Sequence, residues 1–403
     1  MIRFTSHSVD DLMETKLDAD LRLDNYLHFN NGTYDMAHVE SSSDDLKSSR
    51  IKLSWKKQAL FSIIVFIAFL LMLEGVLRLM GVGPVGSTLP SGAGLYQRAN
   101  NAVGFNYTPG WEGIHAGAKV HINSWGWRGR DFAQTKPPGT FRILGVGDSF
   151  VFGKAVDDKD VFLAQLERML NSSSGHAYET LNAGHEGINT ATELQYFNEC
   201  EMTKLAPDVL ILGFTVSNDA ELTPNRRAYR ERKRNSTPWL TITESDWFIA
   251  LSEKSRLAAL LARGAEWASS RELSKINAEV ILSNYEDGSE SWETCRTALM
   301  GFYENCKQHN IPFILVLFPD CSSDLNEAFR DYPEEFIKVH AKLKDVFFRK
   351  NGAIVVDILD DLAATTLTAR ETMVPIDGHP NAVWHELVAR RLQQTIRDLQ
   401  LQR

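Results

Sequence analysis

Hydrophobic and polar positions follow three successive patterns along this 403-residue chain. The first stretch is polar and rather acidic with little apolar periodicity, which is typical of disorder. An unbroken apolar run, Ala59 to Leu73, comes next, and a stretch rich in Gly, Pro and Ser follows it. Short apolar runs then alternate with amphipathic stretches. We expect a disordered cytoplasmic tail at 1–50, a transmembrane helix at 58–80, a linker at 81–100 and a folded domain at 101–403.

The apolar run extends with few charges to about 20 residues, the length that a bilayer requires. Four basic residues between Arg50 and Lys57 precede it, and basic flanks tend to stay in the cytoplasm. Glu74 and Arg78 are spaced to pair on one helix face near the outer end. We expect a single-pass membrane protein whose catalytic domain is extracytoplasmic, periplasmic or at the cell surface. A buried core helix and a cleaved signal peptide are the alternatives; the long leader and the lack of an A-x-A-like site count against the peptide.

From residue 141 onward, β-rich runs alternate with amphipathic helical patterns. This alternation predicts an α/β fold, a three-layer α/β/α domain with a five-stranded parallel sheet. Between about residues 220 and 290 the alternation stops for longer than a simple loop allows, which predicts a helical cap insertion over the strand ends. The predicted strands are Phe141–Val146, Tyr178–Asn182, Val209–Phe214, Pro312–Phe318 and Ala353–Ile358, and the predicted helices include Val161–Leu170, Ala191–Lys204, Trp292–His309, Pro333–Lys350 and Asn381–Leu399.

Chemically active residue types follow the first three predicted strands directly. Gly147-Asp148-Ser149 follows the first, the stretch Asn182 to Gly187 the second, and Ser217-Asn218-Asp219 the third. Parallel sheets carry their sites at the carboxyl ends of the strands, so we expect these segments to meet. Backbone N–H groups and an Asn amide there can hold a developing oxyanion. Taken alone, the first turn equally suits a Ser or Asp that caps the next helix.

A serine hydroxyl needs a general base to attack at neutral pH, and the base needs a carboxylate that fixes its tautomer. Asp377 and His379, in one turn before the C-terminal helix, can supply both groups for Ser149. His185, beside the second strand, is a rival base. We prefer His379 because a carboxylate lies beside it.

In this order, these segments resemble the motif blocks of the SGNH (GDSL-type) hydrolase superfamily. The resemblance implies that Ser149 is the nucleophile and that Asp377 and His379 complete the catalytic triad. It also implies an oxyanion hole formed by Ser149, Gly187 and Asn218. In the second block Gly187 fits the spacing from the strand better than Gly184, the alternative.

The resemblance covers roughly residues 115–400 and implies the flavodoxin-like SGNH fold. It includes His121 to Gly129, a stretch similar to one that precedes the hydrolase domain in membrane-anchored bacterial members. The sequence departs from the family pattern in three places. Phe150 replaces the usual Leu, the third block is longer than usual, and Asp377 and His379 are two residues apart rather than three. The last spacing resembles the polysaccharide O-acetyltransferase branch and some esterase-like members, so whether Asp377 orients His379 is left open.

The leading interpretation is an exported serine esterase that hydrolyses carboxylic ester bonds, with O-acyl groups of envelope polysaccharide as one substrate class. An O-acyltransferase acting on glycans would use the same triad. A non-catalytic glycan-binding or assembly protein on a hydrolase scaffold is the third alternative. The expected partners are an acylated small-molecule or glycan substrate and the membrane. We expect no cofactor and no metal, and the net charge of −9 argues against nucleic acid.

Overall fold

The computed structural model describes residues 54–80, 94–320, 328–346, 353–374 and 378–401, apart from positions 174, 176, 237, 244 and 253. The predicted tail at 1–50 and most of the predicted linker at 81–100 lie outside the described residues. The chain divides into two compact units, Met1–Val65 and Phe66–Arg403. The described part of the first unit is the beginning of helix α1, and the second unit contains the α/β domain.

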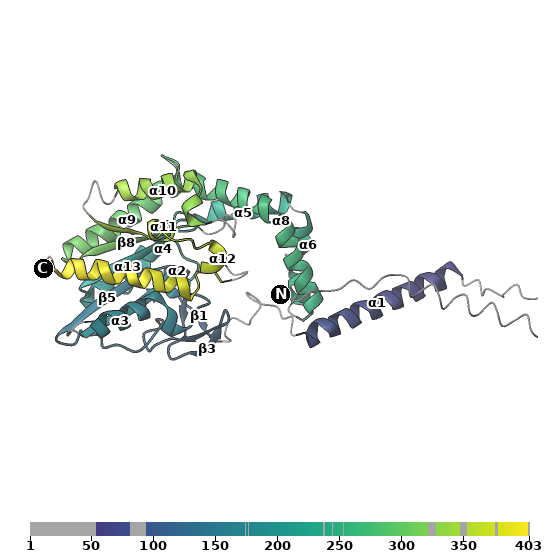
Figure 1. The fold of residues 1–403 in the computed structure, drawn as a ribbon, viewed down its shortest axis with the longest axis horizontal. Coiled ribbons are helices and arrows are strands. Elements are labelled where there is room, and N and C mark those ends of the chain that lie inside the picture. Colours follow the sequence, from purple (N-terminus) through teal and green to yellow (C-terminus); the bar gives the residue numbers. More distant parts are fainter. Residues whose placement is uncertain are drawn as a thin grey trace, which may run out of the picture. The chain divides into compact units, whose positions relative to one another are not determined.

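A fully parallel sheet of five strands forms the centre of the domain (Figure 1). Its strands are β5 (Thr140–Gly147), β6 (Ala177–Gly184), β7 (Val209–Thr215), β8 (Phe313–Phe318) and β9 (Ile354–Asp357). Their order in the sheet is β6-β5-β7-β8-β9. The predicted flavodoxin-like α/β fold is therefore confirmed. In this order β5 lies between the two strands that follow it in the chain, which creates a switch point where α/β sheets bind ligands.

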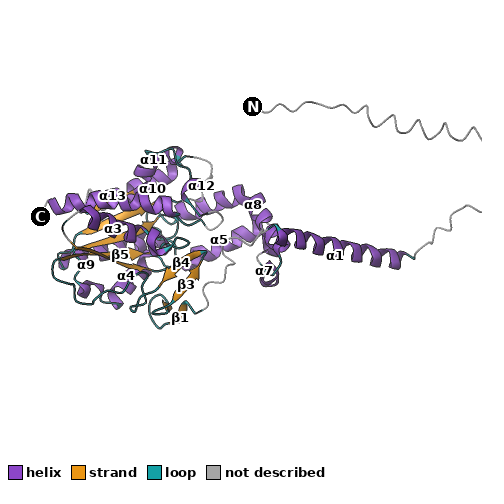
Figure 2. Ribbon diagram, turned by 60° about the horizontal axis from the view of Figure 1, so that its bottom comes forward, coloured by secondary structure: helices purple, strands orange, loops and turns teal. Residues whose placement is uncertain are grey.

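Helices cover both faces of this sheet (Figure 2). The main ones are α3 (Phe162–Ser173), α4 (Thr190–Glu199), α9 (Glu290–Gln308), α10 (Glu334–Lys344) and α13 (Ala382–Leu401). Helix α3 packs beside α13, and α4 packs beside α9. Because helices shield both faces, every residue of β7 and β8 is buried. That burial explains why these strands read as continuous apolar runs in the sequence.

One predicted helix ends early. We expected a single helix at 191–204, but α4 stops at Glu199 and a short 3-10 helix, Met202–Leu205, follows. Glu201 and Ala206 flank the second piece in the left-handed region, with φ of 47° and 50°. Met202 and Leu205 are nevertheless buried, so the apolar periodicity continues across the break and hides it.

Two short antiparallel hairpins precede the sheet, and the sequence did not predict them. They pair β1 (Tyr96–Arg98) with β2 (Phe105–Tyr107), and β3 (Glu112–His115) with β4 (Ala118–His121). Strand β1 falls inside the stretch that we expected to be linker. A small apolar cluster holds the hairpins to the domain, and its buried members are Leu95, Tyr107, Val120, Ile122 and Phe152.

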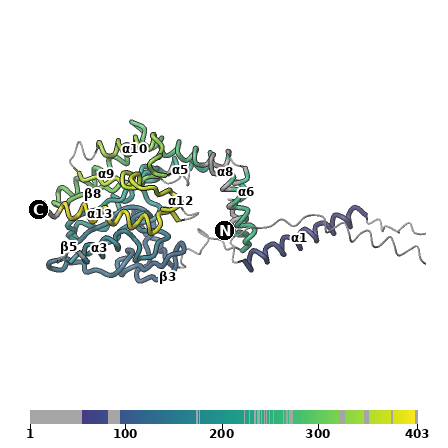
Figure 3. Tube along the Cα trace, in the orientation of Figure 1, coloured from purple at the N-terminus to yellow at the C-terminus, as the bar shows by residue number. Residues whose placement is uncertain are grey.

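The insertion between β7 and α9 is helical, as predicted, and Figure 3 follows it from α5 through α6 and α8. Its helices are α5 (Thr223–Ser236), α6 (Pro238–Thr243), α7 (Asp246–Ser252) and α8 (Arg256–Ser283). We call these four helices the cap. Helices α5, α6 and α7 each pack against α8.

Helix α1, Trp55–Leu79, is 25 residues long and is the one helix among the described residues long and apolar enough to cross a membrane. It begins three residues before the predicted span at 58–80. Leu77 is its one buried residue.

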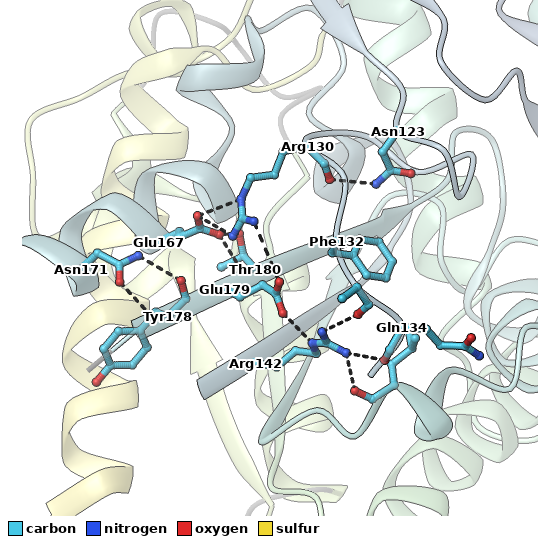
Figure 4. A network of polar contacts seen from close by, with 12 residues as sticks. Asn123, Arg130, Phe132, Gln134, Arg142, Glu167, Asn171, Tyr178, Glu179 and Thr180 are labelled. Atoms are coloured by element: carbon cyan, nitrogen blue, oxygen red, sulfur yellow. Dashed lines mark hydrogen bonds and ion pairs between the residues drawn. The ribbon is translucent and has the colours of Figure 1, made fainter. Parts of the chain in front are cut away.

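A buried arginine fastens the amino-terminal half of the sheet to the preceding loop (Figure 4). Arg142 on β5 has a fully buried side chain, and its Nε donates to Glu179 Oε2 on β6 at 2.7 Å. Its two Nη atoms donate to the carbonyl oxygens of Ala133, Gln134 and Leu205. These bonds compensate the cost of removing a guanidinium from water.

We expect Arg142→Met to lower the free energy of unfolding by about 3–5 kcal/mol. Glu179 would lose its buried partner and keep only the half-exposed Arg130, 3.9 Å away. Urea unfolding of the detergent-solubilised full chain, followed by circular dichroism, measures this. Arg130 provides the matched control in the same network, since its half-exposed side chain bonds Glu167. Arg130→Ala should cost about 1 kcal/mol or less, and equal losses for the two variants would contradict the prediction.

Candidate active site

Ser149 begins the short helix α2 (Ser149–Phe152) immediately after β5. The N-cap of this helix is Asp148, whose side chain accepts a hydrogen bond from Phe150 N at 2.8 Å. Of the two residues that could cap this helix by sequence, Asp148 and Ser149, it is therefore Asp148 that does so. At Gly147 a Cβ would lie 2.3 Å from Val151 Cγ2 and 2.9 Å from the carbonyl oxygen of Gly213. Only glycine fits there, and this close packing determines where the chain turns into α2.

The structure brings the predicted nucleophile and base together across 230 residues of sequence. Ser149 Oγ lies 2.9 Å from His379 Nε2, within the range expected of a nucleophile and its base. His379 precedes α13 and its ring lies 5.7 Å from the ring of Phe150. Asp377, the third predicted member of the triad, lies outside the described residues.

Both remaining predicted residues lie on the same cavity as Ser149 and His379. Gly187 and Asn218 line this cavity, whose volume is about 640 Å³. Gly187 is in the left-handed region, with φ of 76°. The alternative, Gly184, already donates its N–H to Asn182 Oδ1 at 3.0 Å, which favours Gly187 as the oxyanion donor of the second block.

The carboxylate of Asp148 also positions Asn218. Its Oδ2 accepts from Asn218 Nδ2 at 2.9 Å, while its Oδ1 holds Phe150 N. An amide NH₂ carries two N–H bonds, so one remains for a ligand in the cavity. One buried side chain therefore links the turn that carries Ser149 to the segment that carries Asn218.

Two further buried carboxyl groups, Glu193 and Asp219, belong to the electrostatic surroundings of Asp148. Burial, and then repulsion among the three acids, raises the pKa of Glu193 and of Asp219 well above the ordinary value. Burial also raises the pKa of Asp148, although the bonds from Asn218 and Phe150 N oppose it. Burial and mutual repulsion therefore favour the neutral forms of Glu193 and Asp219.

His185, the rival base, is packed into an aromatic cluster. Its ring stacks on Tyr107 at a centroid distance of 4.7 Å and meets the edge of Phe105 at 4.4 Å. Burial lowers its pKa to about 4. The histidine that lines the cavity is His379, so the geometry does not favour His185 as the base.

The sequence reasoning missed a polar wall of the cavity centred on Glu186. Glu186 Oε2 accepts from the hydroxyl of Tyr96 at 2.8 Å and lies 3.0 Å from His115 Nε2. Its Oε1 lies 3.9 Å from Lys154 Nζ. Burial raises the pKa of Glu186, but the interactions with His115, Tyr96 and Lys154 together outweigh it, and the pKa falls below the ordinary value. The cap contributes Arg226 to the same cavity. Glu186 belongs to the stretch Asn182 to Gly187, but the hairpins that bring Tyr96 and His115 to it were not predicted.

We expect His185→Phe to retain catalytic activity within a few-fold of the wild type, whereas His379→Ala should lose it.

His185→Phe should also change the pH dependence of stability. Burial lowers the pKa of His185 from 6.5 to about 4. Between these pH values the unfolded chain therefore binds a proton that the folded chain does not. Stability is complete above the upper value and falls with acid, by at most about 1.4 kcal/mol per pH unit. Urea unfolding between these values should show a shallower loss for His185→Phe, and an unchanged slope would contradict the assignment.

We expect Asp148→Asn to lower kcat with little change in KM, because its amide would face the amide of Asn218 and turn that donor away. Loss of one oxyanion donor costs about 10²–10³ in kcat, and Asn218→Ala should show a loss of this order. The double variant should be no slower than Asn218→Ala, since the two residues act through one bond. Steady-state kinetics on a chromogenic ester measures all three. Losses that simply multiply would show that Asp148 acts by another route.

The fold and these contacts define an α/β domain with a serine–histidine pair at the switch point of a parallel sheet. No family profile and no curated protein matches the chain. Among solved structures, the chain is similar to a putative lipolytic protein of the G-D-S-L family from Desulfitobacterium hafniense, at 13% identity and a TM-score of 0.35. That match covers 63% of this chain and 98% of the other.

Two further solved structures are similar at comparable levels. One is a putative acylhydrolase from Bacteroides fragilis, at 15% identity, a TM-score of 0.35, and coverage of 66% of this chain and 90% of the other. The second is an acetyl xylan esterase, at 12% identity, a TM-score of 0.37, and coverage of 64% of this chain and 100% of the other.

Proposed function

We propose that this chain is a membrane-anchored serine hydrolase of the SGNH type that cleaves carboxylic esters outside the cytoplasm. The observation that carries the proposal is the 2.9 Å contact between Ser149 Oγ and His379 Nε2. It lies on a cavity that Gly187 and Asn218 also line. A nucleophile, a base and two oxyanion donors on one cavity are the parts that acyl transfer needs.

The reaction follows from these positions. His379 Nε2 takes the proton of Ser149 as the hydroxyl attacks the acyl carbonyl, and the carbonyl π electrons move to the oxygen. The backbone N–H groups of Ser149 and Gly187, with the Asn218 amide, hold that oxyanion. His379 then protonates the departing alcohol and leaves an acyl-serine. Water, activated by the same imidazole, releases the acid and restores the serine. We assign Asp377 the role of orienting His379.

The cavity walls support a polar acyl donor. Glu186, Lys154, Tyr96 and Arg226 line it beside the serine, and such charged and hydroxyl groups suit hydroxyl-rich alcohols better than long alkyl chains. Basic residues ahead of α1 support export of the domain. An O-acylated envelope glycan combines both features, and we propose this class as the substrate.

Acyl transfer to a sugar hydroxyl is the second candidate. The two-residue spacing of Asp377 and His379 resembles the O-acetyltransferase branch of the superfamily. The acyl-serine would be the same in both reactions, and only the acceptor would differ. Free acid as the sole product, whether or not a glycan acceptor is present, would count against transfer.

A fluorophosphonate probe tests the proposal directly, because it reacts with serines that a neighbouring base activates. We expect one probe to attach per chain in the detergent-solubilised wild type, at Ser149. Ser149→Ala should abolish labelling and ester hydrolysis together. Ser172→Ala, which removes an exposed serine of α3, is the matched control and should label normally. An unlabelled wild type, or a Ser149→Ala chain that labels equally, would overturn the hydrolase and favour the non-catalytic scaffold.

A further inference from the structure

The cap carries six exposed large apolar side chains, on helices α6, α7 and α8, which pack against one another. Trp239 of α6 and Trp247 of α7 are 73% and 63% exposed. We call these six side chains together the apolar face of the cap: Trp239, Ile242, Trp247, Leu251, Leu260 and Leu261.

The rest of the described domain has no comparable group of exposed apolar side chains close together in the sequence. Outside the cap and the region of α1 up to Met80, the large apolar side chains that are exposed are Tyr96, Ile114, Trp125, Ile337 and Val383. They come from five separate elements or loops. Single exposed apolar residues are normal on a soluble surface, whereas a concentration of them marks an interaction site.

The end of α1 is fastened to the beginning of α8. The Glu74 carboxylate accepts hydrogen bonds from Arg256 N at 3.0 Å and Leu257 N at 2.9 Å, and from the Ser255 hydroxyl at 3.0 Å. A carboxylate in this position satisfies the free N–H groups of the helix and complements its dipole. Arg78 pairs with Glu74 at 2.8 Å and donates to the carbonyl oxygen of Lys254 at 2.9 Å.

These bonds place the start of α8 beside the last turns of the apolar helix. Arg78 is 57% exposed and Lys254 is also exposed. Two cations therefore lie where α1 ends, at the level of lipid head groups if α1 crosses a bilayer. Leu251 is three residues before Lys254, and Leu260 and Leu261 lie in the first turns of α8. Leu251, Leu260 and Leu261 thus lie within seven residues of Lys254.

We infer that the apolar face of the cap lies in the interfacial layer of the same bilayer that α1 spans. The inference rests on the membrane span in the proposed function but not on the catalytic activity. Tryptophan is enriched at membrane–water interfaces, and helices such as α6 and α7 can lie in this layer with apolar side chains inserted about 5–10 Å. A phospholipid surface suits apolar residues on helices that pack with α8, whose first residues bond to the end of the spanning helix.

The cap would then couple the membrane to the cavity. Helix α5 packs against α8 and carries Arg226, which lines the cavity. Membrane contact through α6, α7 and the start of α8 therefore restricts the direction in which the cavity opens. One flexible attachment through α1 would leave that direction free.

Site-directed spin labelling of the full chain tests this inference. The chain, with Cys200 and Cys321 replaced by serine, is reconstituted in nanodiscs of phosphatidylcholine and phosphatidylglycerol. Spin labels are placed at Leu251→Cys and Leu261→Cys, and relaxation is measured with oxygen, which concentrates in lipid, and with a nickel chelate, which stays in water. We expect oxygen-to-nickel accessibility ratios several-fold higher at both positions than at the control Ile337→Cys. Ile337 of α10 and Leu251 are both 45% exposed. Labelling of the chain without an introduced cysteine sets the background.

A label at Ile67→Cys, in α1, distinguishes failure of the membrane anchor from failure of the docking of the cap. A lipid-like ratio at Ile67 with water-like ratios at Leu251 and Leu261 would overturn the docking of the cap and leave the anchor intact. A water-like ratio at Ile67 would overturn the anchor and the docking together. Low accessibility to both reagents with dipolar broadening between labels would show that a second copy covers the face, which also overturns the inference.

Discussion

The arrangement of the site depends on the two hydrogen bonds that the side chain of Asp148 accepts. Its two oxygens hold Phe150 N and the Asn218 amide, so one rigid group ties the ends of β5 and β7 together. The surrounding glycines make this possible. A Cβ at Gly184 would lie 2.2 Å from Phe152 N, and α2 could not approach β6. The sheet thus positions the site through close backbone packing, and the carboxylate fixes which side chains face the cavity.

The buried acids give this arrangement an unusual electrostatic balance. Removing a charge from water is costly unless hydrogen bonds compensate it. Asp148 has two such bonds, whereas both oxygens of Glu193 lack a hydrogen-bond partner among the described residues. Glu193 and Asp219 consequently favour their neutral forms, as their raised pKa values indicate. Asp148 differs from Glu193 in that both its oxygens accept hydrogen bonds, from Asn218 and from Phe150 N at the start of α2.

Much of the fold followed from the sequence because buried parallel strands leave a simple signature. The runs around Val209 and Phe313 are wholly apolar, and the helical cap appeared as an interruption of the alternation. Ser149 was predicted from the residue types after the first strand, and His379 from the turn with Asp377 ahead of the C-terminal helix. The spacing of residues in the sequence does not show which side chains form hydrogen bonds with each other. The bond from Asn218 to Asp148 was therefore not predicted. The hairpins and the early end of α4 were missed because three-residue strands and left-handed residues leave the apolar periodicity almost unchanged.

The distance along the chain between Ser149 and His379 has a consequence for biosynthesis. The two residues are 230 positions apart, and the histidine lies just ahead of the last helix. At translation rates of roughly 5–20 residues per second, about 10–50 s pass between synthesis of the serine and of its partner. During that interval the Ser149 hydroxyl lacks the imidazole that lies 2.9 Å from it in the folded chain. The contact between the two residues can therefore form only after the segment that separates them, the cap included, has been synthesised.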